Sequence, residues 1–208
     1  SDDVVTLLIN EMQRLPADLQ MGLKVAACMG SCVQYSVLVI LSRDLNLDLQ
    51  IVLQQVSEKG FLHNESAASL FRFVHDKVEQ AAIELMSEQE RRGLHMRLGL
   101  ALCSHIPADD RGNVEIFFAA VNQINRGGPG ALTDPRKSDM VAALNLKAGK
   151  RAVAVADFNA AFRLFEHGIS FLPGDPWQPL HYGLSIQLFD AAAEAACITN
   201  NGRVVAFY

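Results

Sequence analysis

A histidine and an aspartate, His75 and Asp76, stand next to each other where the sequence pattern changes from strand to helix. Residues 61–73 alternate as in a β-hairpin, and residues 76–86 place apolar side chains at helical spacing. An aspartate at such a junction is expected to cap the helix by accepting backbone N–H groups, and it could also orient the imidazole. The imidazole either locks the hairpin to the helix by a hydrogen bond or donates to a phosphate oxygen of a nucleotide.

Other residues that could do chemistry do not form a known catalytic pattern. Lys147–Arg151 contains a Gly-Lys pair, but we expect it inside a helix, where the backbone N–H groups cannot cradle a phosphate. The histidines have no metal-ligand spacing, and the serines have no nucleophile motif. The four cysteines, at positions 28, 32, 103 and 197, read as small core residues of a protein from a reducing compartment. We therefore expect no catalytic site and no metal in this chain.

Composition narrows the class of protein further. The chain has 208 residues, half of them hydrophobic. Its net charge is −5, so it lacks the excess of positive charge that nucleic-acid-binding proteins carry. No run of apolar residues is long enough to span a membrane, and no secretion signal is present, so we expect a cytoplasmic protein. Because the chain has no initial methionine, we interpret it as a piece of a longer protein.

The elements that must position His75 form a mainly α-helical pattern. We predict a winged-helix-like subdomain over residues 1–104, in which three helices, one small β-hairpin over 61–73 and a further helix make the winged-helix pattern, preceded by a lead-in helix and followed by a long helix. Gly60 is a typical helix stop before the hairpin. The predicted helices of this subdomain cover 4–13, 16–30, 31–41, 47–57, 76–86 and 88–103.

A turn-rich connector at 105–113 is the predicted boundary, and residues 105–208 are predicted to form a tetratricopeptide-like (TPR-like) region of antiparallel helical pairs. Alanines recur at helix-contact spacing between 148 and 161, and small residues there let helices pack closely. The predicted helices of this region cover 114–125, 134–154, 156–171 and 179–199.

Five ordered motifs resemble the region that follows the nucleotide-binding core in AAA/STAND-type predicted ATPases of multidomain signalling proteins. In that family this core is fused to serine/threonine-kinase, GAF and histidine-kinase domains. The motifs in this chain are Leu15-Pro16, Ala26–Gly30, Phe73–Ala82, Arg91–Gly99 and Leu144–Ala152, followed by Trp177 and Ala193-Glu194. The resemblance covers nearly the whole chain, and it implies a regulatory fragment whose parent binds ATP or ADP.

The His-Asp pair is also similar to the Met-His-Asp motif in the winged helix of plant immune receptors. In that class the histidine contacts the β-phosphate of bound ADP and holds the protein inactive. The similarity implies that His75 is the phosphate sensor and Asp76 its partner, with Val74 in place of the methionine. The phosphate loop would lie in a nucleotide-binding domain upstream, so this piece alone is not expected to hydrolyse ATP.

Two further functions are considered. The helical region could be a nucleotide-independent protein-interaction scaffold, since helical pairs of this kind offer grooves to peptides and partner helices. DNA binding through the winged helix is disfavoured, because the expected recognition segment, Leu47–Ser57, contains no lysine or arginine.

Overall fold

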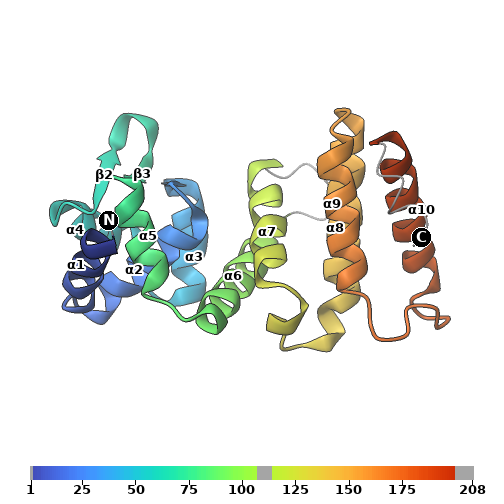
Figure 1. Ribbon diagram of the computed structural model, residues 1–208, viewed down its shortest axis with the longest axis horizontal. Helices are drawn as coiled ribbons and strands as arrows, with labels where there is room; N and C mark the ends of the chain where they lie inside the picture. Colours follow the sequence, from blue (N-terminus) through green and yellow to red (C-terminus); the bar gives the residue numbers. More distant parts are fainter. Residues whose placement is uncertain (1, 107–113, 200–208) are drawn as a thin grey trace. The chain divides into compact units, whose positions relative to one another are not determined.

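The computed structural model describes residues 2–106 and 114–199 and is mainly α-helical with one small antiparallel sheet (Figure 1). The chain divides into two compact units, an N-terminal unit of residues 1–127 and a C-terminal unit of residues 128–208. None of the helices in the described ranges combines the length and apolar character needed to cross a bilayer.

The N-terminal unit has its helices on both sides of a β-hairpin in the sequence, and a third strand comes earlier in the chain. Helix α2 precedes strand β1, helices α3 and α4 follow, and strands β2 and β3 form the hairpin before α5 and α6. The elements are α1 (Asp2–Gln13), α2 (Ala17–Met29), β1 (Cys32–Gln34), α3 (Tyr35–Leu45), α4 (Leu49–Glu58), β2 (Leu62–Glu65), β3 (Leu70–Phe73), α5 (Asp76–Glu84), α6 (Glu88–Cys103) and α7 (Val114–Gly127).

The predicted mainly α fold with a small hairpin is confirmed, and the sheet has one strand more than expected. Its order is β1-β3-β2, with Val33 of β1 opposite Phe71 of β3. The prediction of a helix beginning at residue 31 was therefore wrong, because Cys32–Gln34 pairs with a strand far away in the sequence. Helix α3 begins only at Tyr35.

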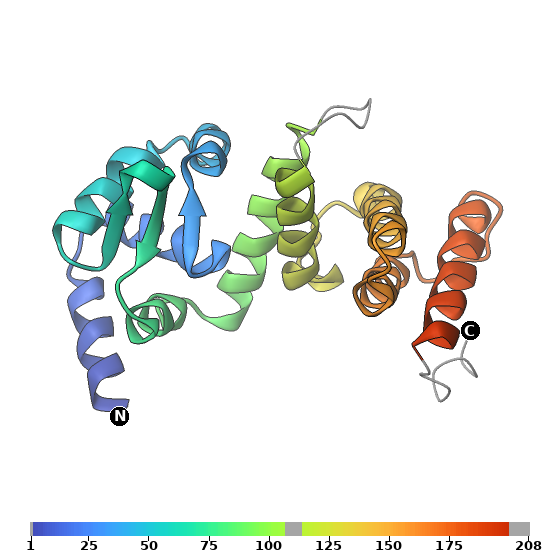
Figure 2. The ribbon, with the colours of Figure 1, turned by 90° about the horizontal axis from the view of Figure 1, so that it is seen from above.

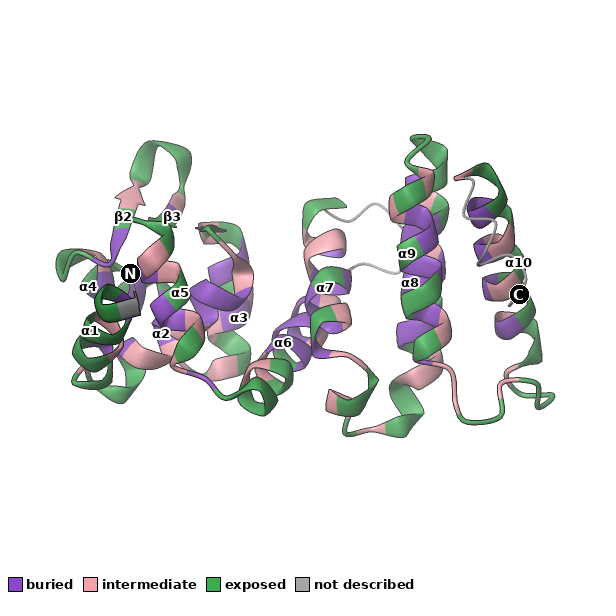
Figure 3. Ribbon diagram, in the orientation of Figure 1, coloured by how far each residue is buried: buried purple, intermediate pink, exposed green. Residues whose placement is uncertain are grey.

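One hydrophobic core holds the helices of this unit against the sheet. Leu23 of α2, Leu38 of α3, Leu53 of α4 and Phe71 of β3 are fully or almost fully buried. The tip of the hairpin, residues 66–69, is exposed instead, and Figure 3 shows it as the green loop joining β2 and β3. One face of the sheet thus packs against the core, and the loop between β2 and β3 is exposed to solvent.

Helix α7 belongs to the N-terminal unit, so the division of the chain lies one helix later than the boundary predicted at 105. Glycines make the contact between α6 and α7 close. A Cβ on Gly99 of α6 would lie 2.7 Å from the backbone nitrogen of Ile124, and one on Gly127 would lie 2.9 Å from that of Met96. Backbones at this distance leave no room for a side chain. The connector predicted at 105–113 lies mostly outside the described residues.

Over residues 128–199 the C-terminal unit contains three long helices, α8 (Ser138–Ala154), α9 (Phe158–Ser170) and α10 (Tyr182–Ile198), and two short 3₁₀ turns, η2 (Pro129–Ala131) and η3 (Pro135–Lys137). Helices α8 and α9 are joined by three residues and lie side by side, as Figure 1 and the end-on view in Figure 2 show. Helix α10 packs on α9.

Gly149 explains the closeness of the α8–α9 pair. A Cβ at this position would lie 2.2 Å from Cε1 of Phe165, so the aromatic ring occupies the space that the glycine leaves. The Gly-Lys pair at 149–150 is inside α8, as predicted, and its glycine has this packing role. The TPR-like array stays a prediction, since the described residues of the predicted region contain α7, the α8–α9 hairpin and α10 and show no repeated unit.

Candidate functional site

The candidate site is the pair His75 and Asp76, and His75 lies at the N-terminus of α5. Its backbone is extended, with φ −162° and ψ 149°, and its side chain is exposed. The Nδ1 atom accepts a hydrogen bond from the backbone N–H of Lys77, with a nitrogen–nitrogen distance of 3.0 Å. An acceptor nitrogen carries no proton, so the neutral ring holds its proton on Nε2 and offers one N–H donor.

The capping role predicted for Asp76 was wrong, because His75 is the residue that caps the helix. Asp76 is the first residue of α5 and is exposed, and its negative charge lies in the first turn, where it interacts favourably with the helix dipole. The sequence pattern favoured aspartate because its short carboxylate is a common cap and a histidine ring is a rare one.

Charges of both signs lie around the start of α5, with Asp76 and Glu79 opposed by Lys77 of the same turn and by Arg126 of α7. Burial raises the pKa of the Glu79 carboxyl, the charge of Asp76 raises it further, and the charge of Arg126 lowers it. Arg126 comes from the last turn of α7, and its guanidinium also donates to the carbonyl oxygen of Cys28 at 3.3 Å. Sequence reasoning missed Arg126, because nothing in its local pattern connects it to a helix fifty residues earlier.

A buried polar chain joins α2, α6 and α7 in the same unit. His95 donates from Nδ1 to Oε1 of Gln123 at 2.6 Å, and Nε2 of Gln123 donates to the carbonyl oxygen of Cys28 at 2.9 Å. The amide of Gln123 is thereby fixed in orientation, which assigns the proton of His95 to Nδ1. Burial holds the pKa of His95 below its ordinary value. This arrangement is structural, since both side chains are buried.

The C-terminal unit contains a second His-Asp pair that the sequence did not reveal. Nδ1 of His181 lies 2.8 and 2.9 Å from the two carboxylate oxygens of Asp139. The contact ties the residue preceding α10 to the first turn of α8, across 42 positions of sequence. Neither residue's immediate sequence neighbours predict this pairing.

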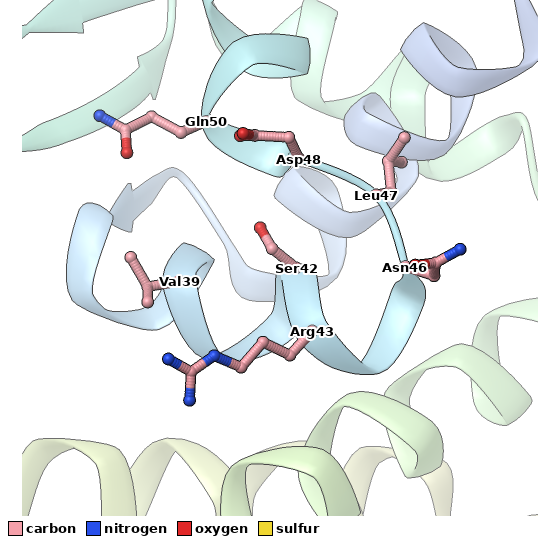
Figure 4. A pocket seen from close by; sticks show the side chains of 7 residues that line it. All are labelled: Val39, Ser42, Arg43, Asn46, Leu47, Asp48 and Gln50. Carbon is pink, nitrogen blue, oxygen red and sulfur yellow. The ribbon is translucent and has the colours of Figure 1, made fainter.

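Two open depressions lie on the helices that would read DNA in a winged helix. One, of about 430 Å³, is at the turn between α3 and α4 (Figure 4). It is lined by Val39, Ser42, Arg43, Asn46, Leu47, Asp48 and Gln50. The other, of about 460 Å³, lies between α4 and the sheet and has amide side chains and two acids but no lysine or arginine in its lining. Surfaces with so little positive charge are unsuited to nucleic acid.

The described residues hold no group of three or more histidines, cysteines or acids placed to bind a metal ion. Cys28 and Cys103 lie within the fold, and burial raises the pKa of each thiol to about 11. Cys32 and Cys197 are exposed. The prediction that the cysteines are small core residues is confirmed for Cys28 and was wrong for Cys32 and Cys197, because Cys32 lies at the start of the short strand β1 and Cys197 lies on the outer side of α10.

Comparisons with protein-family models, with curated proteins and with solved structures found no match to this chain.

Proposed function

We propose that this chain is a regulatory region of a larger ATP-binding signalling protein, in which His75 contacts a phosphate of ADP held by a nucleotide-binding module upstream. The nucleotide state would then be passed on to kinase or partner domains, in the cytoplasm. The observation that supports the proposal best is the exposed imidazole at the head of α5, whose Nδ1 is engaged by Lys77 and whose Nε2–H is the remaining donor.

The capping bond makes His75 a suitable sensor. It fixes the ring orientation and the tautomer before any ligand arrives, so that one directional donor is preorganised. Asp76 and Glu79 of the same helix carry negative charge and Lys77 carries positive charge, so a phosphate would meet charges of both signs near the ring. A single hydrogen bond to a charged group contributes about 1.5–3 kcal/mol, which is enough to bias a two-state equilibrium between ADP-bound and ATP-bound forms.

The test uses the parent protein with its upstream module and compares two substitutions of His75. His75→Asn keeps a side chain that can cap the helix but removes the Nε2 donor, whereas His75→Ala removes both. Both variants should bind ADP about tenfold more weakly by calorimetry, which corresponds to about 1.4 kcal/mol. His63→Ala, at an exposed histidine of β2, serves as the control and should bind normally. Unchanged ADP affinity in His75→Asn would exclude the proposal.

A nucleotide-independent interaction scaffold is the second candidate. The observation in its favour is a group of large hydrophobic side chains that remain exposed on the C-terminal unit, including Trp177, Leu180 and Tyr182. Under this function, partner binding in the parent protein would be the same with ADP, with ATP and without nucleotide. The sensor proposal instead requires binding or signalling to change with the nucleotide.

A further inference from the structure

Helix α10 has apolar side chains on two faces. The first face packs on α9 and contains Ser185, Leu188, Ala192, Ala195 and Ala196, which are all buried. The second face is a stripe defined by Tyr182, Ile186, Phe189, Ala193 and Cys197, and we call it the α10 stripe. Its successive spacings of four, three, four and four residues place all five side chains along one side of the helix.

The α10 stripe is partly open to solvent at its aromatic end. Tyr182 is 50 % exposed and Ile186 is 38 % exposed. Trp177, itself 51 % exposed, extends the stripe, since its ring centroid lies 5.0 Å from that of Phe189 and 6.2 Å from that of Tyr182. Tryptophan and tyrosine are the residues most enriched among those that dominate binding energy at interfaces.

Charge decides what could cover this face. Asp190 and Glu194 lie one turn apart along the edge of the stripe that points away from α9, and both are exposed. Helix α10 contains no lysine or arginine. Lys150 of α8 donates to Gln187 at 3.2 Å, but within residues 114–199 neither Asp190 nor Glu194 forms an ion pair with a cation. The edge therefore presents two negative charges to an incoming surface.

We propose that the α10 stripe docks an amphipathic helix of another polypeptide, one with an apolar stripe of its own and lysines or arginines along the edge that meets Asp190 and Glu194. The side chains of the α10 stripe are large at one end and small at the other, where Ala193 and Cys197 lie. A partner helix can fill the stripe if its small side chains face the large ones and its large side chains face the small ones. A second copy of this chain fits less well. Pairing two α10 stripes about their midpoint would bring the two Asp190 carboxylates together, and like charges repel.

Trp177 gives a direct readout, because it is the one tryptophan of the 208-residue chain. Two 18-residue helical peptides without tryptophan serve as probes, with the same leucine stripe and either lysines or glutamates along one edge. The lysine peptide should shift the Trp177 emission to shorter wavelength and saturate, and it should bind about tenfold more tightly than the glutamate peptide.

Variants of the complete chain separate the two parts of the proposal. Ile186→Ser should weaken the lysine peptide about tenfold, and Asp190→Asn with Glu194→Gln should reduce the difference between the peptides to about threefold or less. Val153→Ser, at an exposed apolar residue of α8, and Glu11→Gln, at an exposed acid of α1, are the matched controls and should bind like the unaltered chain. Circular dichroism checks that each variant keeps its helix content.

Each remaining outcome would overturn the proposal. Equal binding of the two peptides would mean that the acidic edge selects nothing, and absence of binding would mean that the stripe is not a docking site. A chain that sediments as a dimer, and as a monomer after Ile186→Ser, would assign the stripe to a second copy. If the 208-residue chain binds the peptide and the longer parent protein does not, the α10 stripe would be assigned to a helix of the same polypeptide.

Discussion

The Nδ1 atom of His75 lies 3.0 Å from the backbone nitrogen of Lys77, so the histidine, and not the adjacent Asp76, caps α5. This contact gives His75 a structural role that is independent of any nucleotide. It also explains how one residue could serve both the hairpin-to-helix junction and a ligand, since the two ring nitrogens can be used separately.

Replacing His75 should therefore loosen the first turn of α5. His75→Ala should cost about 1 kcal/mol of local stability, which would be seen as about fivefold faster hydrogen exchange at the Lys77 amide. His75→Asn should retain most of the protection, because asparagine is a good cap. Asp76→Ala should change exchange little, and an effect as large as that of His75→Ala would contradict the assigned cap.

Two glycines of α6 should respond to alanine in opposite directions. Gly93 faces open space, so Gly93→Ala should stabilise the helix by about 0.5–1 kcal/mol. Gly99 lies against the backbone of α7, so Gly99→Ala should destabilise the N-terminal unit by about 2 kcal/mol or more. Urea unfolding followed by circular dichroism measures both. Equal effects of the two substitutions would show that α7 does not pack on α6 as described.

Stability should fall below about pH 6.5 because of His95. Burial lowers the pKa of this histidine in the folded state, so the unfolded chain takes up a proton that the native chain resists. The contribution of His95 to the free energy of unfolding should consequently be constant above about pH 6.5. It should decrease as the pH drops from there towards the pKa of His95 in the folded chain.

His95→Gln isolates this contribution, since the other titrating groups are unchanged. The difference in unfolding free energy between the variant and the unaltered chain should be largest at neutral pH and shrink on acidification. A difference that does not vary between pH 5 and 7.5 would mean that His95 is not buried in its neutral form.

The cysteines should react with iodoacetamide in a defined order at pH 8. With a pKa of about 11, Cys28 and Cys103 hold only about one thiolate in a thousand molecules at this pH, and Cys28 is also buried while Cys103 is half-buried. Exposed Cys32 and Cys197 should be alkylated first, as mass spectrometry of the peptides would show. Early labelling of Cys28 would contradict its burial in α2.

Much of the helical pattern could be predicted from the periodicity of apolar residues and from the residues that typically begin or end helices. Helix α6 begins and ends at the predicted residues, and the structure shows that Ser87 and Glu90 form a capping box at its start. The hairpin over β2 and β3 was predicted for a similar reason, since two apolar runs flank a polar turn. Local sequence determined these elements.

The features that were not predicted depend on distant partners. Strand β1 exists because Val33 meets Phe71, and no three-residue segment shows such a pairing in its own sequence. The links from Arg126 to Cys28 and from His181 to Asp139 join residues far apart in the chain. At the candidate site, His75 and Asp76 lie at the hairpin-to-helix junction, as predicted, but His75 and not Asp76 caps the helix. Whether His75 senses a phosphate stays a prediction.

The close approach of α6 and α7 determines where the polypeptide can be divided. A chain that stopped at residue 104 would lose the helix that covers Gly99, and it would expose an apolar flank of α6 to water. Such a shortened chain would aggregate more readily, since newly exposed apolar patches promote association. A division at Gly127–Gly128 keeps α7 with α6 and keeps α8, α9 and α10 together, so this glycine pair is the natural point at which the unit could be exchanged, fused or expressed separately.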